Sequence, residues 1–235
     1  MNITKRKEMI KNICIGILVL FAYFFLTAFE SVPLTLAGID ISQMSQFWKI
    51  IYMFAYEILI MVIIGFLLKD KLKKDFKDIK KNHKKYYSEC LKYWFISLGV
   101  MMFSNLIINS ISTNGIAANQ ETIDTIFKIS PIYMFFSAVL FAPFVEELTF
   151  RQALRNIFKT DTIFILISGL LFGALHVLTS FQSLTDLLYI IPYSAPGIAF
   201  AYMLTKYDNI FVSMGFHFMH NGLIMAMQFA ILLLG

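Results

Sequence analysis

Seven apolar runs, each long enough to cross the hydrocarbon core of a bilayer as a helix, decide what this chain can fold into. They lie near residues 10–28, 47–68, 94–111, 131–158, 161–178, 184–204 and 208–233. Only 15% of the residues are charged, whereas a soluble domain has about a quarter. Because a helix satisfies its own backbone hydrogen bonds in lipid, we expect an all-α, polytopic transmembrane helix bundle of about seven spans.

The basic residues predict how this bundle is oriented. They are concentrated at the N-terminus and in residues 69–93, whereas residues 29–46 and 112–130 carry mainly acidic groups. Cytoplasmic loops are enriched in Lys and Arg, so we expect a cytoplasmic N-terminus, a basic cytoplasmic loop at 69–93 and an external C-terminus. An amphipathic helix on the anionic inner leaflet is the alternative for residues 69–85. The same clustering explains the net charge of +5, so no nucleic-acid partner is expected.

Four features bound the organisation of the chain. The first apolar run lacks a clear cleavage site and is followed by further spans, so it is interpreted as an uncleaved first helix. Residues 1–130 are expected to form N-terminal spans and residues 131–235 a catalytic membrane core. Residues 29–46 form either a loop or a re-entrant piece, which leaves the span count open there. Cys14 and Cys90 have neither disulfide nor metal-ligand spacing and are expected to be unpaired thiols.

Capping residues and prolines mark the later spans. Ser130 before Pro131 is a typical helix start, and Ser183 with Asp186 has the spacing of a capping box. Pro143 is expected to disturb the fourth helix about one turn before a pair of glutamates. Pro192 and Pro196 predict a kink or break in the sixth span.

The acidic pair in VEELTFRQALR is the strongest functional signal. Glu146 and Glu147 follow an uncharged segment of the fourth span, where an ionised carboxylate is unfavourable unless it is paired, hydrated or protonated. Glu147 and Arg151 are four residues apart and can form an ion pair on one helix face. Glu146 is rotated by about 100° from Glu147 and has no such local partner. We therefore expect Glu147 to be held by Arg151 and Glu146 to act as the base.

Three histidines lie in apolar segments of the C-terminal half. They are His176, His217 and His220, whereas His83 lies among lysines and is expected to be solvated. Counting helix rise from the cytoplasmic turns places Glu146, His176, His217 and Asn221 roughly 14–25 Å deep, in one layer. His217 and Asn221 share a helix face, and His220 lies beside that face as a supporting or packing residue. Glu57, in the second span, is expected to line the cavity or to pair with a histidine or Arg151.

This set of residues suits the attack of water on an amide. A carboxylate away from bulk water is a stronger base, and together with His176 it could position and deprotonate a water molecule. His217 and Asn221 could donate hydrogen bonds to the oxygen that becomes negative. The zinc pair HExxH and the nucleophile elbow GxSxG are both absent from the sequence. Zinc bound by Glu146, His176 and His217 remains a disfavoured alternative to catalysis without a cofactor.

The three motifs together resemble the CPBP family, the CAAX prenyl-protease and bacteriocin-processing proteins, also called the Abi family. The motifs are Glu146-Glu147-x-x-x-Arg151, Phe172-x-x-x-His176 and His217-x-x-x-Asn221, and the resemblance covers roughly residues 130–225. It implies an intramembrane glutamate endopeptidase in which Glu146 and His176 activate water. It further implies that Glu147 and Arg151 support the site, that His217 and Asn221 form the oxyanion hole, and that no metal is needed.

The resemblance implies a peptide or membrane-anchored protein substrate and leaves its identity open. The Lys-, Ile- and Phe-rich composition is typical of a bacterium with an AT-rich genome, so we expect a multi-pass protein of the bacterial plasma membrane. Two other functions fit the sequence less well. One is a non-catalytic immunity or scaffold protein that binds a bacteriocin-like peptide or signalling partner, and the other is a small proton-coupled transporter. The oligomeric state is left open.

Overall fold

The computed structural model describes residues 2–111, 118–179 and 181–234. Within these ranges the chain is helical and contains no strand. The helices of the N-terminal half are α1 (Ile3–Ala28), α2 (Val32–Leu36), α3 (Gln46–Leu67), α4 (Lys69–Ile111) and α5 (Ala118–Ile129), with a 3₁₀ turn η1 (Ile41–Gln43). Seven helical stretches are long and apolar enough to cross a membrane, which confirms the predicted polytopic bundle.

The fourth span is one continuous helical rod assembled from five segments. It consists of α6 (Pro131–Phe135), the π-helical η2 (Phe136–Phe141), α7 (Ala142–Glu146), the π-helical η3 (Glu147–Ala153) and α8 (Leu154–Ile157). Ser130 caps its N-terminus by accepting a hydrogen bond from the backbone N–H of Tyr133, as predicted. The expected disturbance at Pro143 takes the form of wide π turns on both sides of α7, which keep the rod unbroken.

The remaining spans are α9 (Asp161–Leu178), α10 (Ile190–Tyr207) and α11 (Ile210–Leu234). A 3₁₀ segment, η4 (Leu184–Tyr189), leads directly into α10 and begins with the predicted Ser183–Asp186 capping box. A kink or a break was predicted at Pro192 and Pro196. A break is absent, because α10 continues through both prolines, and the kink stays a prediction. Pro192 lies in the first turn of α10, where a missing backbone N–H is tolerated.

Two predicted loops are helical. Residues 69–93 are the first half of α4, which runs without interruption into the third span, so the prediction of a basic loop is wrong. Lysines are good helix formers, and four-residue spacings such as Lys71–Asp75 add ion pairs along this helix. Of the predicted loop 112–130, residues 118–129 form α5, and residues 112–117 lie outside the described part. Residues 29–46 contain only the short α2 and η1, so they add no span.

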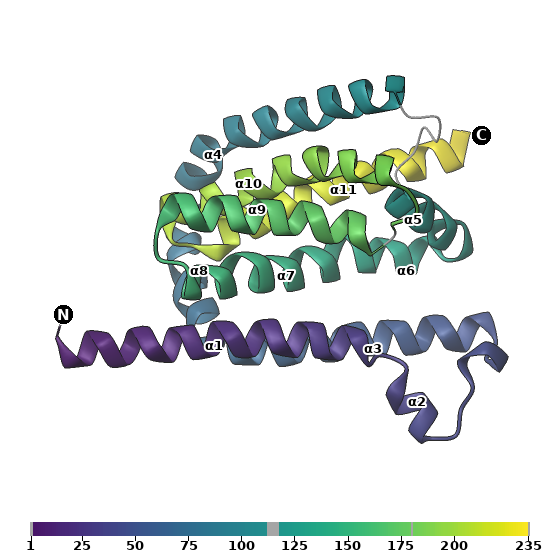
Figure 1. Ribbon diagram of the computed structural model, residues 1–235, viewed down its shortest axis with the longest axis horizontal. Helices are drawn as coiled ribbons and strands as arrows, with labels where there is room; N and C mark the ends of the chain where they lie inside the picture. The colour runs from purple at the N-terminus through teal and green to yellow at the C-terminus, as the bar shows by residue number, and fades with distance from the viewer. Residues whose placement is uncertain (1, 112–117, 180, 235) are drawn as a thin grey trace.

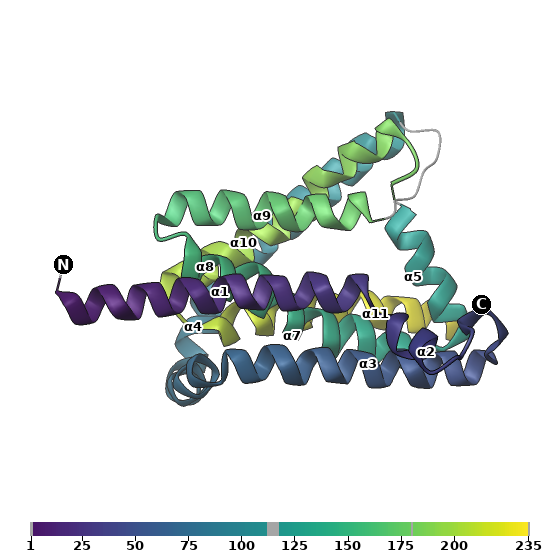
Figure 2. The same cartoon turned by 60° about the horizontal axis from the view of Figure 1, so that its bottom comes forward.

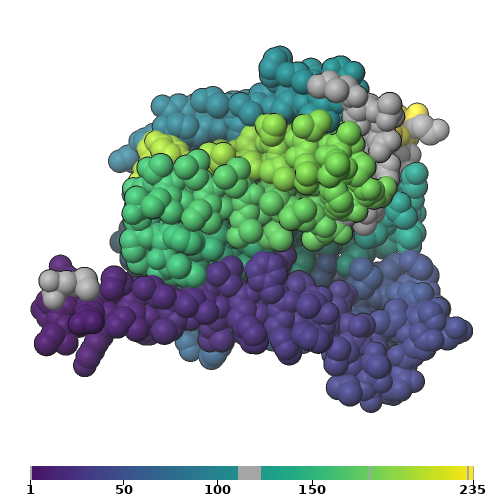
Figure 3. All heavy atoms as spheres, in the orientation of Figure 1, coloured from purple at the N-terminus to yellow at the C-terminus, as the bar shows by residue number. Residues whose placement is uncertain are grey.

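The helices are arranged around a central group. In Figure 1, α1 and α3 run along one side, the C-terminal half of α4 runs along the opposite side, and α7, α9, α10 and α11 lie between them. Figure 2 shows the N-terminal part of α4 end-on beside α3, so this helix passes from one side of the molecule to the other. The space-filling view shows α9 and α10 as one continuous surface, with α1 along its edge (Figure 3). The side of the membrane on which the N-terminus lies stays a prediction.

Close contact between α9 and α10 depends on three glycines. A methyl group added at Gly173 would lie 2.7 Å from the Ile190 carbonyl oxygen and 2.8 Å from the Ser194 nitrogen. One added at Gly197 would lie 3.0 Å from the Gly169 carbonyl oxygen. The two backbones therefore approach more closely than larger residues permit, as is common where helices pack in membranes. This packing fixes His176 and Tyr193, which lie on these two helices, relative to each other.

Candidate active site

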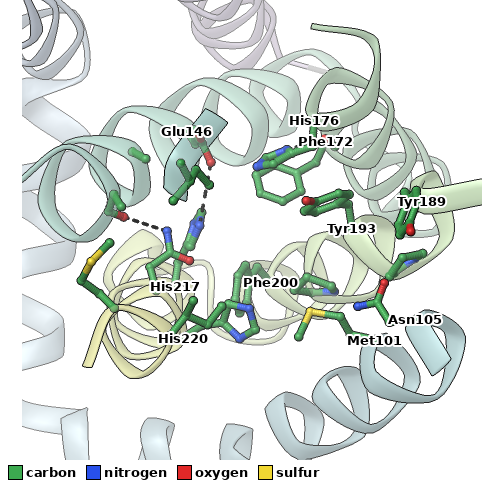
Figure 4. A pocket seen from close by; sticks show the side chains of 18 of the residues that line it. Met101, Asn105, Glu146, Phe172, His176, Tyr189, Tyr193, Phe200, His217 and His220 are labelled. Carbon is green, nitrogen blue, oxygen red and sulfur yellow. Dashed lines mark hydrogen bonds and ion pairs between the residues drawn. The ribbon is translucent and has the colours of Figure 1, made fainter. Parts of the chain in front are cut away.

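A cavity of about 510 Å³ lies inside the helical bundle (Figure 4). Its wall is formed by residues of α4, α5, the α6–η2–α7 rod, α9, η4, α10 and α11. It contains six of the nine residues singled out in the sequence: Glu146, Phe172, His176, His217, His220 and Asn221. The chain thus brings residues from three separate sequence motifs to one cavity.

The two adjacent glutamates diverge at the junction of α7 and η3. Glu146 borders the cavity with 18% of its side chain exposed, whereas the Glu147 side chain is completely buried. Nε of Arg151 lies 3.4 Å from Oε1 of Glu147, which is the predicted ion pair. The π-helical turn that begins at Glu147 directs its side chain into the core behind the cavity wall. The Glu146 carboxylate therefore lines the cavity, whereas the Glu147 carboxylate contacts only buried side chains.

Arg151 is held mainly by charge and by aromatic rings. Its guanidinium lies 4.2 Å from the Phe172 ring centroid and 5.8 Å from that of Phe200. None of its side-chain nitrogens has a hydrogen-bond partner among the described residues. A buried cation without hydrogen bonds is unfavourable unless an opposite charge lies close by. The Glu147 carboxylate supplies that charge.

His217 lies between the two glutamates. Its Nδ1 is 3.0 Å from Oε1 of Glu147, and its Nε2 is 3.8 Å from Oε2 of Glu146. An ionised carboxylate can only accept a hydrogen bond, so Nδ1 carries a hydrogen and Nε2 is directed at Glu146. From the sequence, His217 was placed in one layer with Glu146 and on one helix face with Asn221. Helix faces alone do not show that α11 passes so close to both glutamates.

His176 is oriented by its own helix and by two rings. Its Nδ1 lies 2.9 Å from the Phe172 carbonyl oxygen, which can only accept, so in the neutral ring Nδ1 donates and Nε2 is an acceptor. The imidazole packs against Phe172 at 4.3 Å and stacks on Tyr193 at 5.0 Å, between ring centroids. Figure 4 shows His176 and Glu146 at the same end of the cavity. An unprotonated Nε2 at this place suits a role in handling protons.

Asn221 and His220 complete this end of the cavity. The Asn221 amide donates a hydrogen bond of 2.8 Å to the Ala138 carbonyl oxygen of η2, which uses one of its two N–H groups. His220 packs beside the rings of Trp94 and Phe200. This arrangement agrees with the packing position expected for His220. The second N–H of Asn221 remains available at the cavity wall.

Glu57 lies behind the cavity wall. Its Oε1 accepts hydrogen bonds from the hydroxyls of Tyr133 at 3.0 Å and Ser137 at 2.7 Å. The expectation that Glu57 lines the cavity or pairs with a histidine or Arg151 is wrong within the described residues. Hydropathy could not reveal this arrangement, because the partners lie more than 70 residues away along the chain.

Sequence reasoning missed several residues of the cavity wall. Tyr193 stacks on His176, and Asn105 and Asn109 from α4 form a polar part of the wall. The two asparagines are spaced i, i+4 in an apolar run, a signal that could have been used. Tyr193 carries no signal in the sequence, because aromatic residues are abundant in this chain. Among the described residues, no group of three or more His, Cys, Asp or Glu side chains is arranged to hold a metal ion.

Most of the C-terminal half is similar to one known protein family. Residues 128–223 match the family described as type II CAAX prenyl endopeptidase Rce1-like. This segment contains every residue of the three motifs. No solved structure matches the chain.

Three curated relatives are similar to the chain. The UPF0177 protein YvdC of Lactococcus lactis is 28% identical over 138 residues, which cover 57% of this chain and 49% of that protein. An uncharacterized protein of Mycoplasma capricolum is 33% identical over 144 residues, covering 57% of this chain and 40% of that protein. The putative membrane peptidase YdiL of Bacillus subtilis is 24% identical over 189 residues, with 77% and 71% covered. The chain thus spans about half, or less, of the length of the first two.

Proposed function

We propose that the protein is an intramembrane glutamate endopeptidase, on the premise that residues 128–223 match the family described as type II CAAX prenyl endopeptidase Rce1-like. Its substrate would be a leader peptide or another membrane-associated peptide segment. The observation that carries the proposal is the position of Glu146. This carboxylate borders the cavity beside Nε2 of His217, while Glu147 and Arg151 hold His217 from behind. A set of this kind combines a base with a positioned proton donor.

The proposed reaction begins with a water molecule between Glu146 and His176. As its oxygen attacks the scissile carbonyl carbon, its proton passes to Glu146, and Nε2 of His176 accepts a hydrogen bond from it. Nε2–H of His217 and the second amide N–H of Asn221 donate to the carbonyl oxygen as it becomes negative. Collapse of the tetrahedral intermediate breaks the C–N bond, and the proton on Glu146 is transferred to the leaving amine. No cofactor takes part.

In this mechanism the buried residues act through His217. The Glu147 carboxylate accepts a hydrogen bond from Nδ1 of His217, which fixes the orientation of the ring and directs Nε2 toward the cavity. Arg151 keeps Glu147 ionised and in place. Fixed donors of this kind, held in a cavity of low polarity, stabilise a developing negative charge more strongly than water does.

The experiment that tests the proposal uses purified protein in proteoliposomes and a library of internally quenched nine-residue peptides with uncharged central residues. Wild-type protein should cleave a subset, with the bond identified by mass spectrometry. Glu146→Gln and His176→Ala should lower the rate by about 10²-fold or more, since a general base contributes 10²–10⁴-fold. Glu30→Gln and His83→Ala, which change the same residue types outside the cavity, serve as matched controls and should leave the rate unchanged.

Two outcomes would contradict the proposal. Full cleavage by Glu146→Gln protein would exclude this carboxylate as the base. Cleavage that is abolished by a chelator and restored by zinc would favour the metal alternative. If no peptide is cleaved, and alanine variants of the motif residues retain their phenotype in cells, the non-catalytic immunity or scaffold function gains support.

A further inference from the structure

The cavity continues well beyond the groups that the proposed reaction uses. From His176 its wall passes to Tyr193, then to Tyr189, and then to Asn105 on α4 (Figure 4). Asn109 also lines the wall, next to the Tyr189 hydroxyl. Tyr189 and Tyr193 are four residues apart, which corresponds to about 6 Å along a helix. Together with the 5.0 Å ring contact, this places Tyr189, whose hydroxyl donates to Asn109, roughly 11 Å from His176.

Asn105 is a half-buried amide at the cavity wall, and none of the described residues hydrogen-bonds to its side chain. The residues around it in sequence, Phe103 and Leu106, are exposed and apolar, as expected for a lipid-facing surface. An amide at this depth is unfavourable without a hydrogen-bond partner. Asn105 therefore retains both a donor and an acceptor that face the cavity.

Asn109 lies one helical turn further along the same face. Its Oδ1 accepts a hydrogen bond of 3.1 Å from the Tyr189 hydroxyl, and this leaves its amide N–H groups available. Tyr189 is buried, so the hydrogen bond fixes the orientation of the Asn109 amide. The two asparagines together present donors and an acceptor with the spacing of one helical turn.

Among the residues that the structure describes, no charged side chain lies in this part of the cavity. Apart from Glu146 and the three histidines, every described lining residue is uncharged. The chemistry of the wall therefore disfavours a charged substrate segment, and it offers amide groups that match the N–H and C=O groups of a peptide backbone. A peptide segment drawn into a membrane cavity must have its backbone groups satisfied by the protein.

We propose that Asn105 and Asn109 form a subsite that binds the backbone of an extended, uncharged substrate segment. At 3.3–3.6 Å per residue, the subsite contacts the backbone about three residues from the scissile bond. Recognition through the backbone makes the choice of substrate depend on the absence of charge and of helical structure, and only weakly on side-chain identity. This inference rests on the proposed peptidase function.

The test uses the best-cleaved peptide from the library and a set of derivatives, each N-methylated at one residue on either side of the scissile bond. N-methylation removes one backbone donor. With wild-type protein, methylation about three residues from the bond should raise KM about two- to tenfold, which corresponds to the loss of one hydrogen bond. Asn105→Leu should raise KM by a similar factor for the unmodified peptide, with kcat within about twofold.

The decisive measurement combines N-methylation of the peptide with the Asn105→Leu substitution in the protein. With Asn105→Leu protein, N-methylation at the sensitive position should have no further effect on KM. The matched control is Ser104→Ala, since the Ser104 hydroxyl bonds to the Val100 carbonyl of its own helix and lies outside the cavity. This control should keep the full penalty of N-methylation. Equal penalties in Asn105→Leu and wild-type protein would overturn the subsite.

A binding measurement separates this inference from the proposed reaction. Fluorescence anisotropy of a labelled Ala/Leu nine-residue peptide is measured with Glu146→Gln protein in detergent, with and without Asn105→Leu. Binding that depends on Asn105, in the absence of any cleavage by wild-type protein, would support the subsite and contradict the peptidase function. Cleavage by wild-type protein, with a Kd that neither Asn105→Leu nor Asn109→Leu changes, would support the peptidase function and contradict the subsite. Absence of both binding and cleavage would contradict both.

Discussion

The ion pair between Glu147 and Arg151 gives the sharpest energetic prediction. Both side chains are completely buried, and Nε of Arg151 lies 3.4 Å from Oε1 of Glu147. Arg151→Met preserves much of the side-chain volume but leaves a carboxylate in the core without its cation. Removing one partner of a buried ion pair lowers the free energy of unfolding by about 3–5 kcal/mol. The contact of the guanidinium with Phe172 at 4.2 Å adds to this loss.

The chain contains a matched control one helical turn away. Nη2 of Arg155 lies 2.6 Å from Oδ1 of Asp161, but this pair is partly exposed. Arg155→Met should therefore lower the free energy of unfolding by at most about 1 kcal/mol. The double variant Glu147→Gln/Arg151→Met should be more stable than Arg151→Met alone, because the unpaired charge is then absent.

The free energy of unfolding is measured by steric trapping in bicelles, with the four proteins compared at one lipid composition. Such a loss is a large part of the 5–15 kcal/mol that is typical of folded proteins. The reasoning would be refuted by an Arg151→Met protein as stable as Arg155→Met. It would also be refuted if the double variant gained nothing over the single one, since the penalty would then arise from lost packing and not from the unpaired charge.

Three further predictions concern contacts outside the ion pair. Gly173→Ala should lower the free energy of unfolding by about 1–3 kcal/mol, because its methyl group would meet the α10 backbone, whereas Gly99→Ala has open space and should not destabilise the protein. Glu57→Leu should lower it by about 1–3 kcal/mol, because the Tyr133 and Ser137 hydroxyls lose their acceptor, and Glu57→Gln should retain most of the stability. Asp75→Ala should lower it by about 1 kcal/mol through loss of the hydrogen bond from the Ile210 N–H, whereas the exposed Asp70→Ala should be neutral. Each pair is compared in the same steric-trapping assay, and equal values within any pair would contradict the corresponding contact.

Features that depend on neighbouring residues were predictable from the sequence. The seven spans follow from local hydropathy, and the Glu147–Arg151 pair follows from a spacing of four residues. The Ser130 and Ser183 caps were found for the same reason. For residues 69–85 a helix was the alternative to a basic loop. Its continuation into the third span was missed because the high charge of residues 69–93 was interpreted as a loop, although lysine and glutamate are compatible with a helix.

Features that depend on tertiary contacts were not predictable in this way. The position of His217 between both glutamates requires α11 to pass beside the α7–η3 junction, and the sequence does not specify that approach. Glu57 finds its hydroxyl partners on a rod that lies far along the chain. Asn105 belongs to the N-terminal half, where no motif is present, and only the packing of α4 against α10 brings it to the cavity.

Because η3 is a π-helical turn, the geometry of the site depends on the number of residues between the glutamates and Arg155 as well as on which residues they are. A turn whose hydrogen bonds reach five residues back holds one more residue than an α turn. Deleting a single apolar residue such as Leu148 would allow the segment to close into an α-helix. Glu147 and Arg151 would then be three residues apart instead of four, which shifts the arginine around the helix relative to the Phe172 ring that it contacts, although every charged residue of the motif would still be present. A one-residue gap here therefore alters the contacts of the arginine without changing any charged residue, and a comparison of the motif residues alone does not reveal it.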